Sequence, residues 1–124
     1  MRLKDIIRSE ERFTENVVIR NDIITSVDIN VIGHFGNCSS LEIYGKTITI
    51  LHGYPNTANV GYLIRALVEL FEISEEDGLK LSNIKNIPCR ILLDGSPFGR
   101  CIGFGHFMKN KFVYTEDFVR IAEY

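Results

Sequence analysis

Residues suited to binding a small charged ligand are concentrated in the segment Gly95–Phe112. It contains four of the chain's ten glycines and four of its eight phenylalanines, together with three basic side chains and His106. Glycine lets a backbone approach a ligand closely, aromatic faces stack on bases, and arginine and lysine bind phosphate. This mixture indicates a site for a phosphorylated small molecule that carries a base. The structural alternative is a β-hairpin with its glycines at bulges.

Two regions of the chain supply the candidate ligand-binding residues. Glycines with positive φ or close approach, here Gly99, Gly103 and Gly105, can expose amides that accept an anion, and so can a helix start. We therefore expect the glycine-rich segment and the start of the predicted main helix to converge on one anion pocket. The candidate ligand-binding residues are Phe98, Arg100, Gly103, Gly105, His106, Phe107, Met108, Lys109 and Lys111, followed by Arg65 and Asn56.

The sequence offers little for catalysis or metal binding. Cys101 and His106 could in principle form a thiolate nucleophile and its base, but nothing places a third residue to orient the histidine. The pairs His34-x-x-x-Cys38 and Cys101-x4-His106 only approach the spacing of zinc ligands. No phosphate-binding loop or dinucleotide fingerprint is present. We therefore expect a binding protein with no catalytic residue, no bound metal and no cofactor.

The length and net charge of the chain limit the classes of molecule that it could bind. A chain of 124 residues fits one domain, and a net charge of −2 argues against a general binder of genomic nucleic acid. Five acidic and no basic side chains lie between Glu69 and Leu79, whereas Lys80 to Tyr114 holds six basic and one acidic side chain, a net charge of +5. That basic half suits a small anion. No apolar run reaches the roughly 18 residues of a membrane span and no signal-peptide core is seen, so we expect a cytoplasmic protein without a membrane partner.

Hydrophobic spacing predicts an α+β fold: an antiparallel β-sheet meander packed against one main α-helix, with a second β-hairpin and short terminal helices. The main helix is expected over Ala58–Ile73, capped by Thr57 or Asn59. Short helices are expected over Arg2–Arg12, which would dock loosely or serve a subunit contact, and over Thr115–Ala122 with Thr115 as its cap. We expect a single domain, with residues 1–15 as a helical extension, 16–114 as the core and 115–124 as the C-terminal helix.

The strands are predicted from β-branched runs and from turn residues. Val17–Ile32 reads as strand, with Asn21-Asp22 as a candidate break, and its odd-numbered residues from 23 to 31 are expected to share one face. Gly45-Lys46 predicts a two-residue type II′ turn in the next hairpin. A second hairpin is expected from Cys89–Leu93 and Arg100–Met108.

Four short motifs, in order along the chain, carry a resemblance to a known family. They are Gly61-Tyr62-Leu63-Ile64-Arg65, Cys89-Arg90-Ile91, Gly103-Phe104-Gly105-His106 and Lys109-Asn110-Lys111-Phe112. Between Thr25 and Tyr114 the pattern resembles the phage Thoeris anti-defence sponge family. The resemblance implies a non-enzymatic protein that sequesters cyclic ADP-ribose isomers made by bacterial TIR-domain enzymes. It also implies a homo-oligomer, a dimer or higher assembly, and some members bind cyclic oligonucleotides as well.

The chain also departs from that family. Members often carry tryptophan after the helix and at the position of Phe112, whereas this chain has no tryptophan and has Tyr54-Pro55 before the helix. It also adds about fifteen N-terminal residues. Two other functions remain open. One is an inhibitor that contacts a defence effector directly, with the acidic run Glu69–Asp77 mimicking nucleic-acid charge; the other is a hydrolase of the same nucleotide signal.

Overall fold

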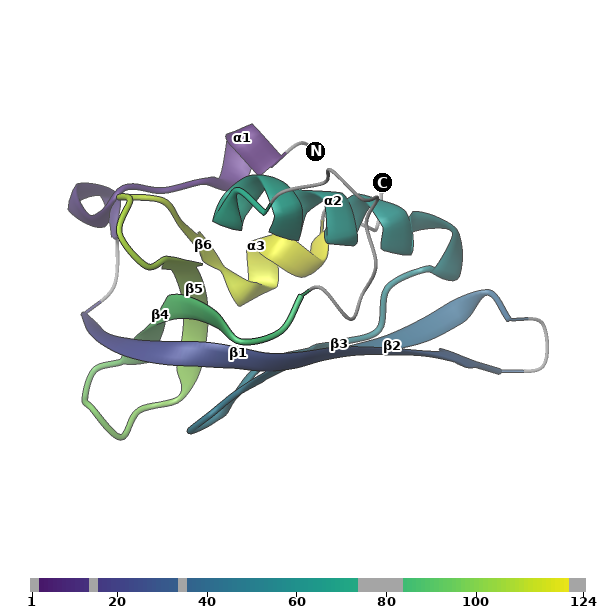
Figure 1. Ribbon diagram of the computed structural model, residues 1–124, viewed down its shortest axis with the longest axis horizontal. Helices are drawn as coiled ribbons and strands as arrows, with labels where there is room; N and C mark the ends of the chain where they lie inside the picture. The colour runs from purple at the N-terminus through teal and green to yellow at the C-terminus, as the bar shows by residue number, and fades with distance from the viewer. Residues whose placement is uncertain (1–2, 14–15, 34–35, 74–83, 121–124) are drawn as a thin grey trace.

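The computed structural model describes residues 3–13, 16–33, 36–73 and 84–120. It confirms the expected fold class: six antiparallel strands form a curled sheet in the order β3-β2-β1-β4-β5-β6, with the helices against one face (Figure 1). No helix in these ranges is long and apolar enough to cross a membrane. The elements are α1 (Leu3–Ile6), the 3-10 turn η1 (Glu10–Arg12), β1 (Val17–Ile32), β2 (Cys38–Gly45), β3 (Thr49–Gly53), the 3-10 turn η2 (Thr57–Asn59), α2 (Val60–Phe71), β4 (Ile87–Asp94), β5 (Cys101–His106), β6 (Phe112–Tyr114) and α3 (Thr115–Arg120).

The central strand β1 runs unbroken for 16 residues and pairs with β2 on one side and β4 on the other. The candidate break at Asn21-Asp22 is therefore wrong. Asp22 is 7% exposed, and its carboxylate accepts hydrogen bonds from Thr47 Oγ1 at 2.7 Å and from Lys46 N at 3.0 Å. Because this buried carboxylate is satisfied, it anchors the neighbouring turn instead of ending the strand.

A β-bulge changes which residues of β1 face the core. The register with β2 shifts between Ile24 and Ser26, so that Ile24 and Val27 are both buried while Ile23 is partly exposed. The single face predicted for the odd-numbered residues from 23 to 31 is therefore wrong. An extra residue in one strand inverts the alternation of side chains beyond it.

The turn between β2 and β3 is longer than the predicted two-residue connection. β2 ends at Gly45 and β3 begins at Thr49. Gly45 lacks the positive φ that a type II′ turn needs at its first central residue. Its N–H donates to Ile48 O at 2.8 Å, and Lys46 N donates to Ile23 O at 2.9 Å. Contacts with β1 therefore shape this turn, and the residues of the turn alone do not predict those contacts.

The main helix is confirmed as α2, Val60–Phe71, which follows directly on the 3-10 turn η2. Its buried side chains join those of the sheet in one hydrophobic core. Asn59 occupies the N-cap position of α2, as predicted, but makes no side-chain capping hydrogen bond there. The capping bond is made one turn earlier, where Asn56 Oδ1 accepts a hydrogen bond from Ala58 N at 2.9 Å at the start of η2. Asn56 is thus engaged in starting the helical segment.

The N-terminal segment belongs to the core and is not loosely docked. Leu3 and Ile6 of α1 are 7% and 6% exposed. Beyond them, Arg8 and Phe112 exchange backbone hydrogen bonds of 2.7 and 2.9 Å. This bridge requires an extended backbone, so the helix predicted over Arg2–Arg12 is wrong beyond Ile6, apart from the single turn η1. Arg2 itself lies outside the described residues.

The C-terminal helix is confirmed over Thr115–Arg120, and Ala122 lies outside the described residues. Phe118 is fully buried in the core. Thr115 is the first residue inside α3, and among the described residues its hydroxyl makes no capping hydrogen bond; it donates to Ile102 O at 3.3 Å. This hydrogen bond ties the start of α3 to β5.

The predicted second hairpin is confirmed by β4 and β5. The sheet curls until β3 and β5 contact each other without pairing, and α3 contacts both strands. The curl therefore brings two strand edges from distant parts of the chain to opposite sides of one cavity.

Candidate functional site

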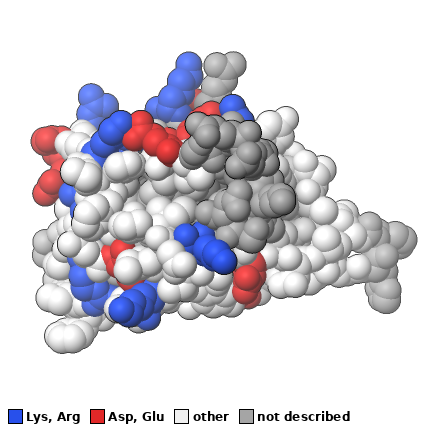
Figure 2. Space-filling model, in the orientation of Figure 1, with Lys and Arg blue, Asp and Glu red and all other residues white. Residues whose placement is uncertain are grey.

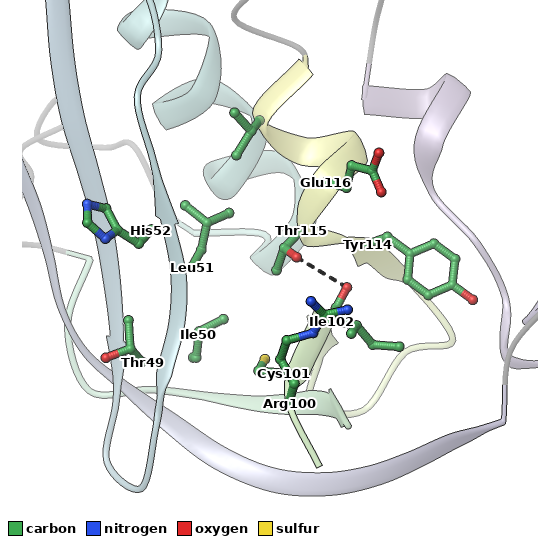
Figure 3. A pocket seen from close by; sticks show the side chains of 11 residues that line it. Thr49, Ile50, Leu51, His52, Arg100, Cys101, Ile102, Tyr114, Thr115 and Glu116 are labelled. Atoms are coloured by element: carbon green, nitrogen blue, oxygen red, sulfur yellow. Dashed lines mark hydrogen bonds between the residues drawn. The ribbon is translucent and has the colours of Figure 1, made fainter. Parts of the chain in front are cut away.

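A cavity of about 430 Å³ lies between β3, the start of β5 and α3 (Figure 3). β3 supplies Thr49–His52, β5 and the residue before it supply Arg100–Ile102, and the opposite wall is formed by Tyr114–Glu116 and Val119. The β5–β6 pairing brings the second and third walls together, whereas the wall from β3 is distant in sequence and reaches them through the curl of the sheet. Of the predicted site residues, Arg100 alone is part of this lining.

Arg100 is the cation available to a ligand in this cavity. Its side chain is exposed and extends into the space between β3 and α3 in Figure 3. Within the described parts of the chain, its guanidinium has neither a hydrogen-bond acceptor nor an acidic partner. A guanidinium presents a planar fork of donors that matches phosphate or carboxylate oxygens. The cavity can therefore bind an anion at Arg100.

The other polar side chains of the lining that can carry charge lie beside partners of their own. His52 Nε2 lies 3.7 Å from Glu42 Oε1, and Glu116 Oε1 accepts a hydrogen bond of 2.7 Å from Arg120 Nη2. Arg120 thus opposes the negative charge of Glu116 at the cavity wall. Among the described residues, an anion that enters would therefore meet Arg100 without a competing partner and Glu116 already paired with Arg120.

Unpaired strand edges add backbone hydrogen-bonding groups. β3 is the outermost strand on its side of the sheet, and β6 pairs with β5 only over Gly103–Gly105, leaving Cys101 and Ile102 without a strand partner on that side. Edge strands present free N–H and C=O groups. The carbonyl of Ile102 is used by Thr115 Oγ1 (Figure 3). The remaining edge groups of β3 suit the polar edge of a heterocyclic base.

The glycines do not form the predicted anion nest. Among the described glycines only Gly33, Gly36 and Gly95 have positive φ. An added Cβ at Gly103 would lie 2.6 Å from Val113 O and 2.7 Å from Leu92 Cδ1. Gly103, Gly105 and Gly99 therefore allow close approach to the protein's own backbone, and the expectation that they expose amides to a ligand through positive φ is wrong.

His106 is held by its own loop. Nδ1 accepts hydrogen bonds from Met108 N and Lys109 N, both at 3.0 Å, and Nε2 lies 3.4 Å from Glu72 Oε2. An Nδ1 that accepts two bonds is unprotonated, so Nε2 carries the proton. Burial lowers the pKa of His106, aided by Lys111, Lys109 and Arg90 and opposed by Glu72. Neutral His106 organises the loop after β5.

We expect this arrangement to make the fold acid-sensitive. With the pKa of His106 lowered on folding, the unfolded chain binds its proton first as pH falls below about 6.5, so the free energy of unfolding decreases from there until pH passes the folded-state pKa. His106→Asn keeps an acceptor near the position of Nδ1 and removes the titration. Denaturant unfolding between pH 7 and 5 should show a shallower loss for the variant; equal losses would contradict the role given to His106.

Lys109 and Lys111 bind the C-terminal end of α2. Lys109 Nζ lies 2.6 Å from Glu72 Oε1, and Lys111 Nζ donates to Glu69 O at 3.2 Å. Cations stabilise the C-terminal end of a helix, where free carbonyls gather. Asn56 caps the opposite end of the same helical segment. The prediction that the glycine-rich segment and the start of the main helix converge on one anion pocket is therefore wrong for a single chain.

The surface charge follows the same pattern of local pairing. Arg65 Nε lies 3.7 Å from Glu69 Oε1 on the exposed side of α2. Figure 2 shows basic side chains at separate places on one face, several with acidic side chains beside them, and no continuous basic surface on its described part. Of the basic residues in the second half of the sequence, Arg90, Lys109 and Lys111 lie around His106 beside Glu72, whereas Arg100 lies at the cavity.

The large apolar side chains of Gly95–Phe112 divide between core and surface. Phe104 is fully buried, with its ring stacked 6.1 Å from that of Phe71, and offers no face to a ligand. Phe98 is 96% exposed, Met108 82% and Phe107 42%. None of these three lines the cavity. Base stacking on the predicted phenylalanines therefore does not occur within the cavity of a single chain.

The cysteine–histidine pair does not form a dyad. Cys101 begins β5 and donates to Gly103 O at 3.4 Å, whereas His106 ends the strand and has the partners given above. Burial raises the pKa of Cys101 and raises that of Cys89 to about 12. Over the described residues, no group of three or more His, Cys, Asp or Glu side chains could hold a metal ion. His34, a metal candidate in the sequence, lies outside those residues.

Sequence reasoning missed the walls contributed by β3 and α3. The sequence predicts Thr47–Leu51 as the second strand of the hairpin at Gly45-Lys46, with His52 just after it, and Thr115 and Glu116 as the first turn of a short helix. No local spacing distinguishes them, because their proximity to Arg100 depends on the order and curl of the strands.

Comparisons with protein-family models, with curated proteins and with solved structures find no match to this chain.

Proposed function

We propose that this chain is a non-enzymatic phage protein that binds a cyclic ADP-ribose-type nucleotide and withholds it from its receptor, thereby inhibiting Thoeris defence. The observation that most supports the proposal is the guanidinium of Arg100, unpaired among the described residues, in a cavity of about 430 Å³. Sites for small molecules are typically about 300–1,000 Å³. The protein acts in the cytoplasm of the infected bacterium.

The cavity has the groups that such a ligand needs. A phosphate oxygen pair fits the fork of Arg100, and the free edge of β3 can hydrogen-bond the edge of a base. A nanomolar dissociation constant corresponds to about −12 kcal/mol, and a preformed cavity lowers the entropic cost of reaching it.

Retention of an intact ligand also agrees with the chemistry of the lining. Sequestration requires tight binding in a stoichiometric amount and no reacting group. The thiol of Cys101, which lines the cavity, is kept protonated by the burial that raises its pKa. A protonated thiol is a poor nucleophile.

One observation favours the second candidate function, an inhibitor that binds a defence effector directly. Phe98 is 96% exposed at the tip of the β4–β5 loop. Exposed aromatic side chains are frequent anchors of protein interfaces. This function requires no nucleotide in the cavity, so ligand retention distinguishes it from the first.

The test is a retention experiment. The purified chain is incubated with a cyclic ADP-ribose isomer and filtered, and the retained fraction is heat-denatured and assayed by mass spectrometry. We expect intact nucleotide in an amount approaching one molecule per chain. Recovery of a cleaved product would show a hydrolase instead, and absence of retention would contradict sequestration and leave direct contact with an effector.

A further inference from the structure

A ligand with two phosphates needs more positive charge than Arg100 supplies. Among the described residues, Arg100 is the only lysine or arginine in the cavity lining. Ionised phosphate is bound most tightly by charge-assisted hydrogen bonds, and one guanidinium fork matches one pair of oxygens. One phosphate of a diphosphate would therefore lie beyond the fork of Arg100. A second cation beside the cavity would complete the site.

Arg120 of α3 is bound to a residue of the cavity wall. Its Nη2 donates to Glu116 Oε1 at 2.7 Å, and Glu116 lines the cavity. Figure 3 shows Glu116 on the first turn of α3, on a different wall from Arg100. The hydroxyl of Thr115 ties the start of this helix to β5. The guanidinium of Arg120 is thus held beside the cavity by a helix that the core and β5 fix in place.

The pair between Arg120 and Glu116 is easily exchanged. Its side chains are 47% and 77% exposed, so water and salt screen their attraction. Ion pairs four residues apart on an exposed helix stabilise it only weakly. Within the described chain Arg120 has no other acceptor. Because Glu116 would face water once released, a phosphate at the cavity wall can replace it as the partner of Arg120 at little cost.

The other ion pair of α3 is built differently. Arg8 Nη2 lies 3.5 Å from Asp117 Oδ2, and the Arg8 guanidinium also lies over the Tyr114 ring, 4.8 Å from its centroid. The backbone of Arg8 is held as well by its bridge to Phe112. Arg8 is therefore part of the packing of the N-terminal segment, and removing the carboxylate of Asp117 would free no cation for the cavity.

We propose that Arg120 is a second phosphate-binding residue of the cavity, which leaves Glu116 for the ligand: Arg100 binds one phosphate and Arg120 the other. The inference rests on the proposed function and names the part of the ligand that the site selects. A diphosphate engages both arginines, whereas a single phosphate engages Arg100 alone. The site should therefore prefer a diphosphate-containing nucleotide to a monophosphate of the same base.

Removing the second cation tests this preference. Arg120→Gln keeps a polar side chain without the charge, and it should raise the dissociation constants for inorganic pyrophosphate and for a cyclic ADP-ribose isomer about tenfold, through the loss of a charge-assisted contact. The dissociation constant for inorganic phosphate should stay unchanged. Titrations followed by protein NMR measure all three, weak binding included. An equal loss for phosphate and pyrophosphate, or no loss for pyrophosphate, would overturn the proposal.

Removing the competing carboxylate tests the exchange itself. Glu116→Gln should lower the dissociation constant for pyrophosphate, because Arg120 no longer has to leave a partner. The gain should be about twofold greater with Arg120 present than in the double variant with Arg120→Gln, which has no cation to release. Equal gains in the two backgrounds would mean that Glu116 acts by repulsion alone, and the exchange would be wrong.

Asp117→Asn is the matched control for Glu116→Gln. It removes one carboxylate from the same helix without releasing Arg120, so pyrophosphate should bind as in the wild type. An increase in affinity as large as that of Glu116→Gln would contradict the specific role of Glu116. Circular dichroism verifies that each variant is folded.

This inference and the proposed function fail separately. If the chain retains the nucleotide but Arg120→Gln binds it as tightly as the wild type, the second phosphate contact is wrong and sequestration stands. If no nucleotide is retained but pyrophosphate binds with the expected dependence on Arg120 and Glu116, sequestration is wrong and the exchange stands. A wild-type chain that binds neither would overturn both.

Discussion

Replacing Arg100 with alanine is expected to raise the dissociation constant for a cyclic ADP-ribose isomer about hundredfold, since a charge-assisted hydrogen bond contributes about 1.5–3 kcal/mol and the fork can form two. The cavity has no second cation that is free among the described residues, because Arg120 is bound to Glu116. Isothermal titration calorimetry measures the change. The thermal unfolding temperature should not move, because the exposed Arg100 side chain has no hydrogen-bond or ion-pair partner in the described chain.

Two controls separate this effect from a general loss of positive charge. Arg65→Ala removes a guanidinium that lies on α2, 3.7 Å from Glu69 Oε1 and outside the cavity lining. Lys109→Ala removes an ammonium bound to Glu72 at 2.6 Å. Both should retain the nucleotide as the wild type does. If either weakened binding as much as Arg100→Ala, or if Arg100→Ala bound normally, the site assignment would be wrong.

Replacing Gly105 with alanine should lower the free energy of unfolding by about 3 kcal/mol, the upper part of the range for overpacking a core. Gly105 lies in β5 opposite Phe112 of β6. A Cβ there would collide with Lys111 O and with the Phe112 ring. The same carbonyl accepts the hydrogen bond from His106 N at 2.9 Å, so relief of the collision would also disturb the β5–β6 pairing. Urea denaturation measures the loss.

Gly61→Ala is the matched control for Gly105→Ala. Gly61 lies in the first turn of α2, where an added Cβ meets nothing within 4 Å. Alanine is favoured over glycine in a helix by about 1 kcal/mol, so this variant should be more stable than the wild type. A Gly105→Ala chain as stable as the wild type would contradict the close approach of β5 and β6.

The elements that sequence reasoning placed correctly are those encoded by local periodicity. α2, the second hairpin and α3 each follow from apolar residues at the spacing of a helix or from alternation between turn residues. The misplaced features depend on contacts across the sheet. The bulge in β1, the turn after β2 and the end of α1 at Ile6 are shaped by partners such as Asp22 and Phe112.

The candidate site was likewise predicted correctly in part and wrongly in part. Composition identified Arg100 as a residue able to bind phosphate, and the structure places its guanidinium in the cavity. It also grouped Lys109, Lys111 and His106 with Arg100 because they are close in sequence. These three instead close the loop against Glu69 and Glu72, since a β-strand carries its two ends far apart.

By itself, the sequence determined an α+β chain with one amphipathic helix and a segment rich in glycine, aromatic and basic residues, because residue types and short-range spacing are properties of the linear chain. Only the tertiary structure decided which cation is free, which glycines face backbone and which strand edges oppose each other. Those outcomes depend on the curl of the six-stranded sheet, which brings β3 and β5 together across about fifty residues. Long-range pairing of this kind leaves no periodic mark in the sequence.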